Sequence, residues 1–328
     1  PGGVSSKMLE SGSEQNAYRL KSIPTNAVRK APGEVLVDDL GSYDKKKWRF
    51  FELKNNYVSL PESQWYNEFG STSYMLPGKA FWLIVKDASR IINTGETRSI
   101  STNKIYSVLL NTGYTFIGNP FNYEIPLTNL KLKKNNRTLD SILTYSGYWS
   151  DEKESIKPFE GYAIWRESPD SLLIDPVIHP LRPGSISRNA GLGKNSYLCT
   201  ISIVAKCQEA KDYYNKIGFS QSASVGNDEL DVPEPPVIGE YVSVYFPHTG
   251  WTSLAKYYAT DVRPEPREGD EWDFEVKSNI KDIVQLTFNG IENVPKQFEV
   301  WLVDNLTKET TNLREGNAYS FANAGEKS

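Results

Sequence analysis

The chain has 328 residues, with 41 acidic against 37 basic side chains, a formal net charge of −4 and 12% aromatic residues. This slightly acidic balance argues against sequence-independent binding of nucleic acid, which needs an excess of Lys and Arg on one face. The 2 histidines nearly exclude a His-rich zinc or iron site, and no apolar run approaches the ~20 residues of a membrane-spanning helix. The many Tyr, Phe and Trp residues, interrupted by Gly and Pro, are typical of an all-β protein.

The first part of the chain is predicted to hold a short tail and then many short strands. Residues 1–16 are rich in Gly, Ser and charge, and we expect a tail or linker there. The opening Pro-Gly-Gly does not resemble a native start, so we expect a mature or excised fragment. Over residues 17–178, β-branched and aromatic runs alternate with Pro, Gly and Asn at strand-like spacing. Segments 35–40 and 127–142 each have room for a short helix.

This strand-rich region contains an internal repeat. A Pro-x-x-[Ala/Gly]-[Phe/Tyr] motif followed by an apolar run begins at Pro77 and again at Pro158. Upstream of it, we align Tyr18 of the first copy with Tyr106 of the second. Because a repeated sequence implies a repeated structure, we predict two similar β modules in tandem. The predicted modules are about residues 17–100 and 101–178.

The second part of the chain is predicted to be an Ig-like β-sandwich over residues 196–328, joined to the first by a linker over 179–195. Several strands alternate apolar with polar residues, which indicates a sheet with one solvated face. The predicted strands cover residues 197–206, 241–246, 272–276, 284–288 and 298–303. We expect the sandwich to lack its last strand, which would leave an uncovered edge.

The two cysteines lie in or directly after the predicted strand over 197–206. Cys199 and Cys207 are separated by roughly 26 Å if the strand is continuous, and they are then too far apart to bond to each other. A pair of buried free thiols is one interpretation, and a disulfide across a sharp bend is the other. Cysteine usage therefore leaves the redox compartment open.

Several motifs recur in the order of one known family of proteins. They are Asp38-Asp39-Leu-Gly-Ser-Tyr, Pro77-Gly-Lys-Ala-Phe-Trp, Gly118-Asn-Pro-Phe, Pro158-Phe-Glu-Gly-Tyr, Glu234-Pro-Pro, Phe274-Glu-Val and Phe298-Glu-Val-Trp. Together they resemble segments of large proteins that Bacteroidetes, Ignavibacteria and relatives export by the type IX secretion system. The resemblance covers most of residues 17–325. It implies a secreted, extracellular, cell-surface protein, with a further strand and a C-terminal sorting domain following this region.

The resemblance and the residues together favour a non-catalytic function. The chain contains no Gly-x-Ser-x-Gly elbow and no phosphate-binding loop. His248 is near plausible acidic partners, Asp261 or Asp270, but we interpret it as a loop histidine. We therefore predict no enzyme active site and no catalytic cofactor, and an accessory, adhesive or assembly segment of a larger protein. One alternative is the C-terminal region of a secreted, subtilisin-like peptidase, whose catalytic domain would lie upstream.

Aromatic side chains in predicted loops are the candidate ligand-binding residues. Trp65, Tyr66 and Tyr74 fall in an insertion of the first repeat, and Tyr148 and Trp149 lie near the corresponding place in the second. Exposed rings on loops stack on sugars or grip a protein partner, so a carbohydrate-binding module is the other alternative function. The competing interpretation is that these rings close the ends of small β cores. Tryptophans within strand patterns, including Trp301, are predicted to pack in a core or on a sheet face.

Clustered acidic and amide side chains give a candidate calcium site. Asn227, Asp228, Glu229 and Asp231 are close together, and their oxygens suit a hard cation. The spacing is not that of an EF-hand, so an acidic surface loop is the competing interpretation.

Partners are expected at the uncovered sandwich edge. Other domains of the parent protein, neighbouring copies and cell-surface proteins are each expected to pair there by β-strand addition. No nucleic acid and no membrane span are expected.

Overall fold

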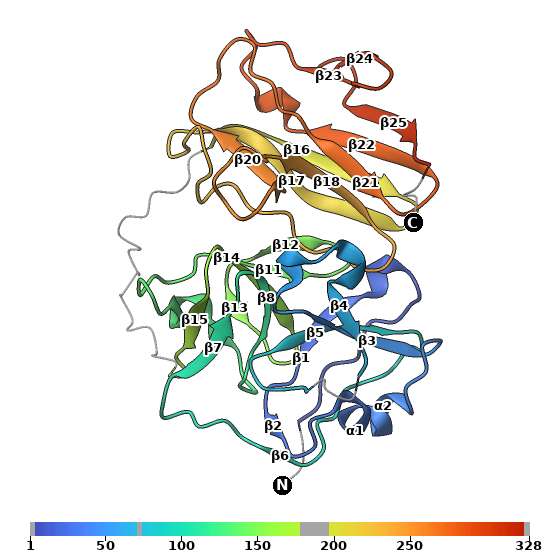
Figure 1. Ribbon diagram of the computed structural model, residues 1–328, viewed down its shortest axis with the longest axis vertical. Helices are drawn as coiled ribbons and strands as arrows, with labels where there is room; N and C mark the ends of the chain where they lie inside the picture. Colours follow the sequence, from blue (N-terminus) through green and yellow to red (C-terminus); the bar gives the residue numbers. More distant parts are fainter. Residues whose placement is uncertain (1–3, 71–73, 178–196, 325–328) are drawn as a thin grey trace. The chain divides into compact units, whose positions relative to one another are not determined.

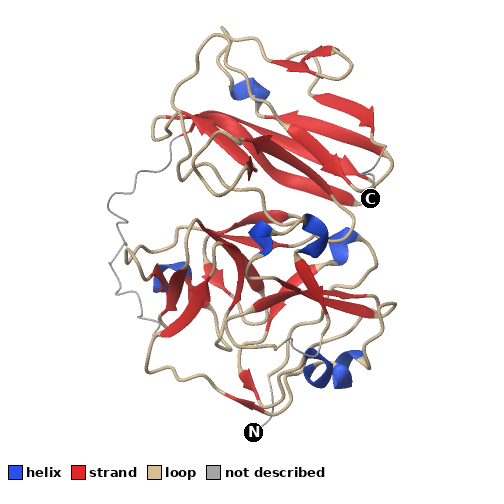
Figure 2. Cartoon of the chain, in the orientation of Figure 1, coloured by secondary structure: helices blue, strands red, loops and turns tan. Residues whose placement is uncertain are grey.

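The computed structural model describes residues 4–70, 74–177 and 197–324 (Figure 1). The chain forms two compact units, residues 1–181 and 182–328. Almost all of its regular structure is β-strand (Figure 2), which confirms the predicted all-β fold. The predicted linker over 179–195 lies outside the described residues. Over the described ranges, no helix is long and apolar enough to span a bilayer.

The first unit is built on two four-stranded antiparallel sheets with the same strand order. In each sheet, the first strand pairs with the fourth, the fourth with the second, and the second with the third. The first sheet is β1 (Arg19–Ser22), β5 (Ala80–Val85), β3 (Trp48–Leu53) and β4 (Tyr66–Glu68). The second is β8 (Gly113–Gly118), β14 (Gly161–Arg166), β11 (Ile142–Tyr145) and β12 (Trp149–Glu152).

Shorter elements surround the two sheets of the first unit. A three-stranded sheet has the order β10 (Leu130–Leu132), β15 (Asp170–Ile174) and β7 (Tyr106–Leu110). Two strand pairs are β2 (Asn26–Ala27) with β6 (Thr97–Arg98), and β9 (Ile125–Pro126) with β13 (Ser155–Ile156). The helical turns are α1 (Pro32–Val35), α2 (Val37–Leu40), η1 (Gln15–Ala17), η2 (Tyr57–Ser59), η3 (Glu62–Gln64) and η4 (Leu127–Asn129). The expected helix at 35–40 is therefore two single turns, and the one at 127–142 is a short 3-10 turn.

The strand pairing corrects the alignment of the repeat. Ala80 pairs with Ser22, and Gly161 pairs with Gly118, so Ser22 and Gly118 occupy equivalent positions. Counting back along each strand makes Tyr114 the counterpart of Tyr18, and the prediction that Tyr106 fills this role is wrong. The reason is that Tyr106 begins β7, which belongs to the separate three-stranded sheet.

The two repeats contact each other through equivalent backbone groups. The Ser22 N–H donates to the Phe159 carbonyl at 3.0 Å, and the Gly118 N–H donates to the Gly78 carbonyl at 3.1 Å. Because these donors and acceptors are pairwise equivalent, the two contacts are related by a local pseudo-two-fold axis. Each Pro-x-x-[Ala/Gly] turn thus hydrogen-bonds to the first strand of the other repeat.

One of the two turns also inserts a side chain into the core of the other repeat. Phe159 has a positive φ of 66° and packs, 6% exposed, in the core cluster of the first repeat. Its counterpart Gly78 has a φ of 78° and carries no side chain. A Cβ at Gly78 would meet Val108 at 2.8 Å and Tyr106 at 2.9 Å, so β7 occupies the corresponding space.

Residues 4–16, expected to be a tail or linker, pack on the first unit. Leu9 is 6% exposed and belongs to the core cluster of the first repeat. The N–H groups of Leu9 and Gly12 donate to the carbonyls of Arg90 and Val85 at 2.7 and 2.9 Å. Burial of one leucine with these backbone bonds ties the segment to the first unit.

The second unit is a β-sandwich of a five-stranded and a three-stranded sheet. The larger sheet is β20 (Thr260–Arg263), β17 (Ala210–Ser220), β16 (Tyr197–Cys207), β22 (Ile283–Asn289) and β25 (Ala318–Ala322). The smaller sheet is β19 (Tyr257–Tyr258), β18 (Val242–Pro247) and β21 (Glu275–Ser278), of which β18 packs on β16 and β17. A hairpin of β23 (Trp301–Val303) and β24 (Thr310–Asn312) follows the turn η5 (Ile291–Asn293).

Both cysteines lie in β16, and both are buried and free. The interpretation as buried thiols is therefore confirmed, because a single continuous strand holds the two sulfurs apart.

Candidate functional site

The predicted ligand-binding aromatics occupy equivalent positions in the two repeats. Tyr66 pairs with Leu53 in the first sheet, and Trp149 pairs with Tyr145 in the second. Trp149 is 9% exposed, and its ring lies 5.6 Å from that of the fully buried Trp82. Burial raises the pKa of Tyr66 far above its usual range. Trp149 is therefore part of the core surface, which favours the competing interpretation that such rings close the ends of the β cores. Tyr66 is half-buried, and its role as a ligand-binding residue stays a prediction.

The remaining predicted aromatics differ in exposure. Trp65 is half-buried, donates its Nε1–H to the Leu60 carbonyl at 3.0 Å, and packs edge-on against Tyr57. Tyr74 and Tyr148 are 52% and 38% exposed. These two tyrosines are the most exposed of the five predicted residues, and their role stays a prediction.

The predicted calcium loop uses its carboxylates to fold itself. Asp228 accepts the backbone N–H groups of Leu230 and Ser224, one on each oxygen. Asp231 is 4% exposed and accepts the N–H of Val262 at 3.0 Å and that of Asp228 at 2.9 Å. Burial raises the pKa of Asp231 to about 7, although these hydrogen bonds favour its charged form.

This geometry favours the acidic surface loop over the calcium site. Asn227 and Glu229 are exposed, and each oxygen of the two aspartates already accepts a backbone N–H. Within residues 4–70, 74–177 and 197–324, no group of three His, Cys, Asp or Glu side chains is arranged to hold a metal ion.

His248 pairs with one of the two aspartates that the sequence suggested. Its Nε2 lies 2.9 Å from Oδ2 of Asp261, whose side chain is 4% exposed, and its ring stacks on Trp251 at 3.6 Å. Arg263 Nε lies 3.5 Å from the other oxygen of Asp261. Because His248 follows β18 and Asp261 lies in β20, the pair connects the two sheets of the sandwich. This supports the interpretation of His248 as a structural residue.

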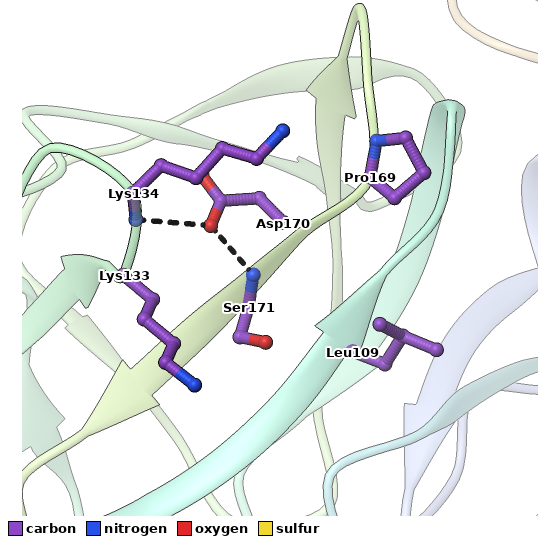
Figure 3. Close-up of a pocket in the computed structure, with 6 residues that line it drawn as sticks. All are labelled: Leu109, Lys133, Lys134, Pro169, Asp170 and Ser171. Carbon is purple, nitrogen blue, oxygen red and sulfur yellow. Dashed lines mark hydrogen bonds between the residues drawn. The ribbon is translucent and has the colours of Figure 1, made fainter.

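A surface pocket of about 440 Å³ lies beside the three-stranded sheet of the first unit. Its lining is Leu109, Lys133, Lys134, Pro169, Asp170 and Ser171 (Figure 3). Asp170 accepts the backbone N–H groups of Lys134 and Ser171, and its second oxygen lies 3.6 Å from Arg166 Nη2. The side chains of Lys133 and Lys134 extend in different directions. The pocket therefore lacks polar groups that converge on one ligand.

The second unit offers a different kind of surface at the edge of its larger sheet. β25 is the edge strand of that sheet over the described residues (Figure 1). Tyr319 and Phe321 are half-buried, whereas Ala318, Ser320 and Ala322 are exposed. An edge strand of this kind presents unpaired backbone groups to another chain.

The hairpin that precedes β25 in the sequence exposes three apolar side chains, including Trp301, which was predicted to pack in a core or on a sheet face. Trp301 is 52% exposed, Val303 51% and Leu306 95%. The Trp301 Nε1–H donates to Glu299 at 2.8 Å, which fixes the ring at the surface. Leu302 between them is 8% exposed and faces inward. The predicted strand over 298–303 did not indicate which of its apolar side chains would be covered.

Comparison with known proteins finds no family model, no curated protein and no solved structure that matches the chain. The resemblance to proteins exported by the type IX system stays a prediction from sequence motifs.

Proposed function

We propose that the chain is a non-catalytic binding and assembly segment of an exported cell-surface protein. The observation that carries the proposal is the edge strand of the second unit over the described residues, β25, where exposed residues alternate with half-buried aromatics. The exposed Trp301 and Val303 on the adjoining hairpin extend the same kind of surface. By contrast, the carboxylates, the histidine and the lysine pocket that are candidates for chemistry are engaged in the fold or do not converge.

The test of location uses intact cells that encode the chain. Antibody labelling and protease treatment of intact cells should detect the chain and remove it, while a cytoplasmic marker stays protected. A chain that is protected in intact cells and released only on lysis would overturn the proposed surface location.

The test of the non-catalytic assignment uses the purified chain. We expect no turnover of peptide, ester or glycoside substrates. Sustained hydrolysis of any of them by homogeneous protein would overturn this part of the proposal.

A second candidate function, sugar binding, is favoured by Trp301. Its ring is 52% exposed and is oriented through Glu299, so it offers a flat apolar face, with Thr310 exposed on the neighbouring strand. Aromatic plates with polar neighbours are suited to stack on a sugar ring. Screening against neutral glycans should find a ligand whose affinity falls at least about tenfold in Trp301→Ala.

Two matched controls separate this site from the predicted tyrosines. Leu306→Ala removes an exposed aliphatic side chain from the same hairpin, and Tyr74→Ala removes an exposed ring from the first unit. Both should bind the glycan as the unmodified chain does. Binding that is lost in Tyr74→Ala but kept in Trp301→Ala would move the sugar site to the first unit.

A further inference from the structure

We propose that two copies of this chain pair through β25, antiparallel and in register about a two-fold axis at Ser320. The two larger sheets of the sandwiches would then form one continuous sheet. This inference rests on the proposed assembly function and names the partner of its open edge as a second copy.

The backbone of β25 has the correct groups directed outward. The Phe288 N–H donates to the Asn317 carbonyl at 2.8 Å, and the Asn323 N–H donates to the Asp282 carbonyl at 3.0 Å. Hydrogen-bonded pairs alternate along an antiparallel ladder, so Tyr319 and Phe321 also direct their backbone groups toward β22. The N–H and C=O groups of the exposed residues between them must therefore point away from β22.

Those outward groups are self-complementary in the proposed register. Ser320 faces Ser320 of the second copy, and Ala318 faces Ala322 of the second copy. Each is a hydrogen-bonded pair, because the outward groups belong to these three residues. In this register each outward N–H group of one copy therefore lies opposite an outward C=O group of the other copy.

The side chains of β25 are also self-complementary. The strand reads Ala-Tyr-Ser-Phe-Ala, so the proposed register brings each Tyr319 opposite a Phe321. Tyr319 and Phe321 pair with Leu286 and Val284, which are buried, and therefore lie on the inward face of the sheet. Both rings are half-buried in one copy. Cross-strand aromatic pairs stabilise a sheet, and pairing would cover these rings further.

The pairing strand itself is uncharged, and two acidic groups of the β23–β24 hairpin, Asp304 and Glu309, accept from the Tyr319 hydroxyl at 2.6 and 3.4 Å. No charged side chain occurs from residue 316 to residue 324. Edge strands that must stay unpaired are commonly protected by a charge, often Lys, or by Pro, and this strand has neither. Two identical strands with any charge at the axis would repel each other, so a neutral strand is the charge pattern that a two-fold pairing requires.

The surface buried when two short strands pair limits the strength of the dimer. It is well below the ~1,600 Å² of a standard stable interface, so we expect a weak dimer. Many copies on one surface would raise the effective concentration and populate the pair.

The first experiment is disulfide trapping of the full chain with Ser320→Cys. The axis places the two introduced thiols in directly opposite positions, where Cα atoms are about 5.5 Å apart. Cys199 and Cys207 are buried, so the unmodified chain supplies the background. The control Ala318→Cys places its two thiols roughly 14 Å apart along the ladder. We expect rapid covalent dimer formation for Ser320→Cys and slow formation for Ala318→Cys. Equal rates for the two variants would overturn the register.

The second experiment is sedimentation of the unmodified chain from low micromolar to near-millimolar concentration. We expect a reversible monomer–dimer equilibrium that Ser320→Lys weakens at least about tenfold, because two charges meet at the axis. The control is Gln285→Lys, which puts the same charge on the exposed residue paired with Ser320 on β22. It should leave the equilibrium unchanged. Circular dichroism checks that both variants fold.

Failure of this inference is distinguishable from failure of the proposed function. A chain that stays monomeric at the highest concentration, or a dimer that Ser320→Lys and Gln285→Lys affect equally, would overturn pairing through β25. Detection of that same chain on intact cells would leave the proposed function standing.

Discussion

Gly161 lies where β14 of the second repeat meets β1 of the first. A Cβ at this position would be 2.6 Å from Leu20 Cγ and 2.8 Å from the Ala80 Cβ. Gly161→Ala should therefore lower the free energy of unfolding of the first unit by about 1–3 kcal/mol, the usual effect of overpacking. Denaturant titration measures this change. Gly250→Ala is the control, since a Cβ there meets no atom within 4 Å, and a comparable loss in it would refute the argument.

Phe159 combines a buried side chain with a positive φ. Phe159→Ala should cost about 3–5 kcal/mol, because the core of the first repeat loses an aromatic ring. Phe159→Gly loses the same ring but relieves the φ of 66°, so it should be more stable than the alanine variant by about 1 kcal/mol. Comparing the unfolding free energies of the two variants tests this order. An alanine variant that is the more stable of the two would contradict it.

Asp231 makes the stability of the second unit depend on pH. Burial raises its folded pKa to about 7 from the ordinary value of 3.8, so the folded state binds the proton more tightly than the unfolded state does. Its contribution to stability is therefore present at low pH and is lost as pH rises from about 4 through 7. Asp231→Asn should abolish this slope, whereas Glu229→Gln in the same loop should keep it. Urea titrations between pH 4 and 8 measure both, and parallel curves for the unmodified chain and Asp231→Asn would exclude this role.

Glu68 gives the opposite pH dependence in the first unit. Burial alone would raise its pKa, but hydrogen bonds from Arg49, Lys45 and Tyr43 lower the pKa to about 2. Its stabilisation is therefore present above its ordinary value of 4.5 and is lost as pH falls toward 2. Glu68→Gln should be less stable than the unmodified chain at pH 7, and the difference should vanish near pH 2. Acid unfolding monitored by circular dichroism tests this, and a constant difference would refute it.

At the scale of elements, the sequence predicted strands well where one face of the strand is apolar. β16 and β22 match their predicted ranges closely because buried and exposed residues alternate along them. β17, of equal length to β16, was missed because polar residues interrupt its pattern. One of these is Asp212, which accepts the N–H of Val244 on the other sheet at 2.8 Å. Such a tertiary hydrogen bond leaves no periodic signal in the sequence.

The same limit explains which parts of the candidate surface were predicted. An uncovered sandwich edge was predicted from the number of strands, but β25 itself was not identified as a strand. Trp301 was expected in a core or on a sheet face, and its exposure of 52% was not predicted because a strand pattern alone does not say which face is covered. For Tyr66 and Trp149 the sequence left two interpretations open, an exposed loop or the end of a β core. They begin β4 and β12, and Trp149 packs against Trp82. Whether a residue next to a turn is buried depends on how the other repeat packs against it, and the local sequence does not predict that packing.

At the scale of the whole molecule, each compact unit has its own buried residues. The first unit is a pair of β repeats and the second is a β-sandwich, so each is expected to unfold separately. We therefore expect two thermal transitions in calorimetry rather than one. Gly161→Ala should lower the first-unit transition alone, by about 2–4 °C for each kcal/mol lost. Gly218→Ala should lower the other transition alone, because its Cβ would lie 2.6 Å from the Cys199 carbonyl oxygen within the larger sheet of the sandwich. A single transition that both substitutions shift would mean that the two units unfold cooperatively. The stability of the β25 variants would then report on the whole chain rather than on the second unit alone.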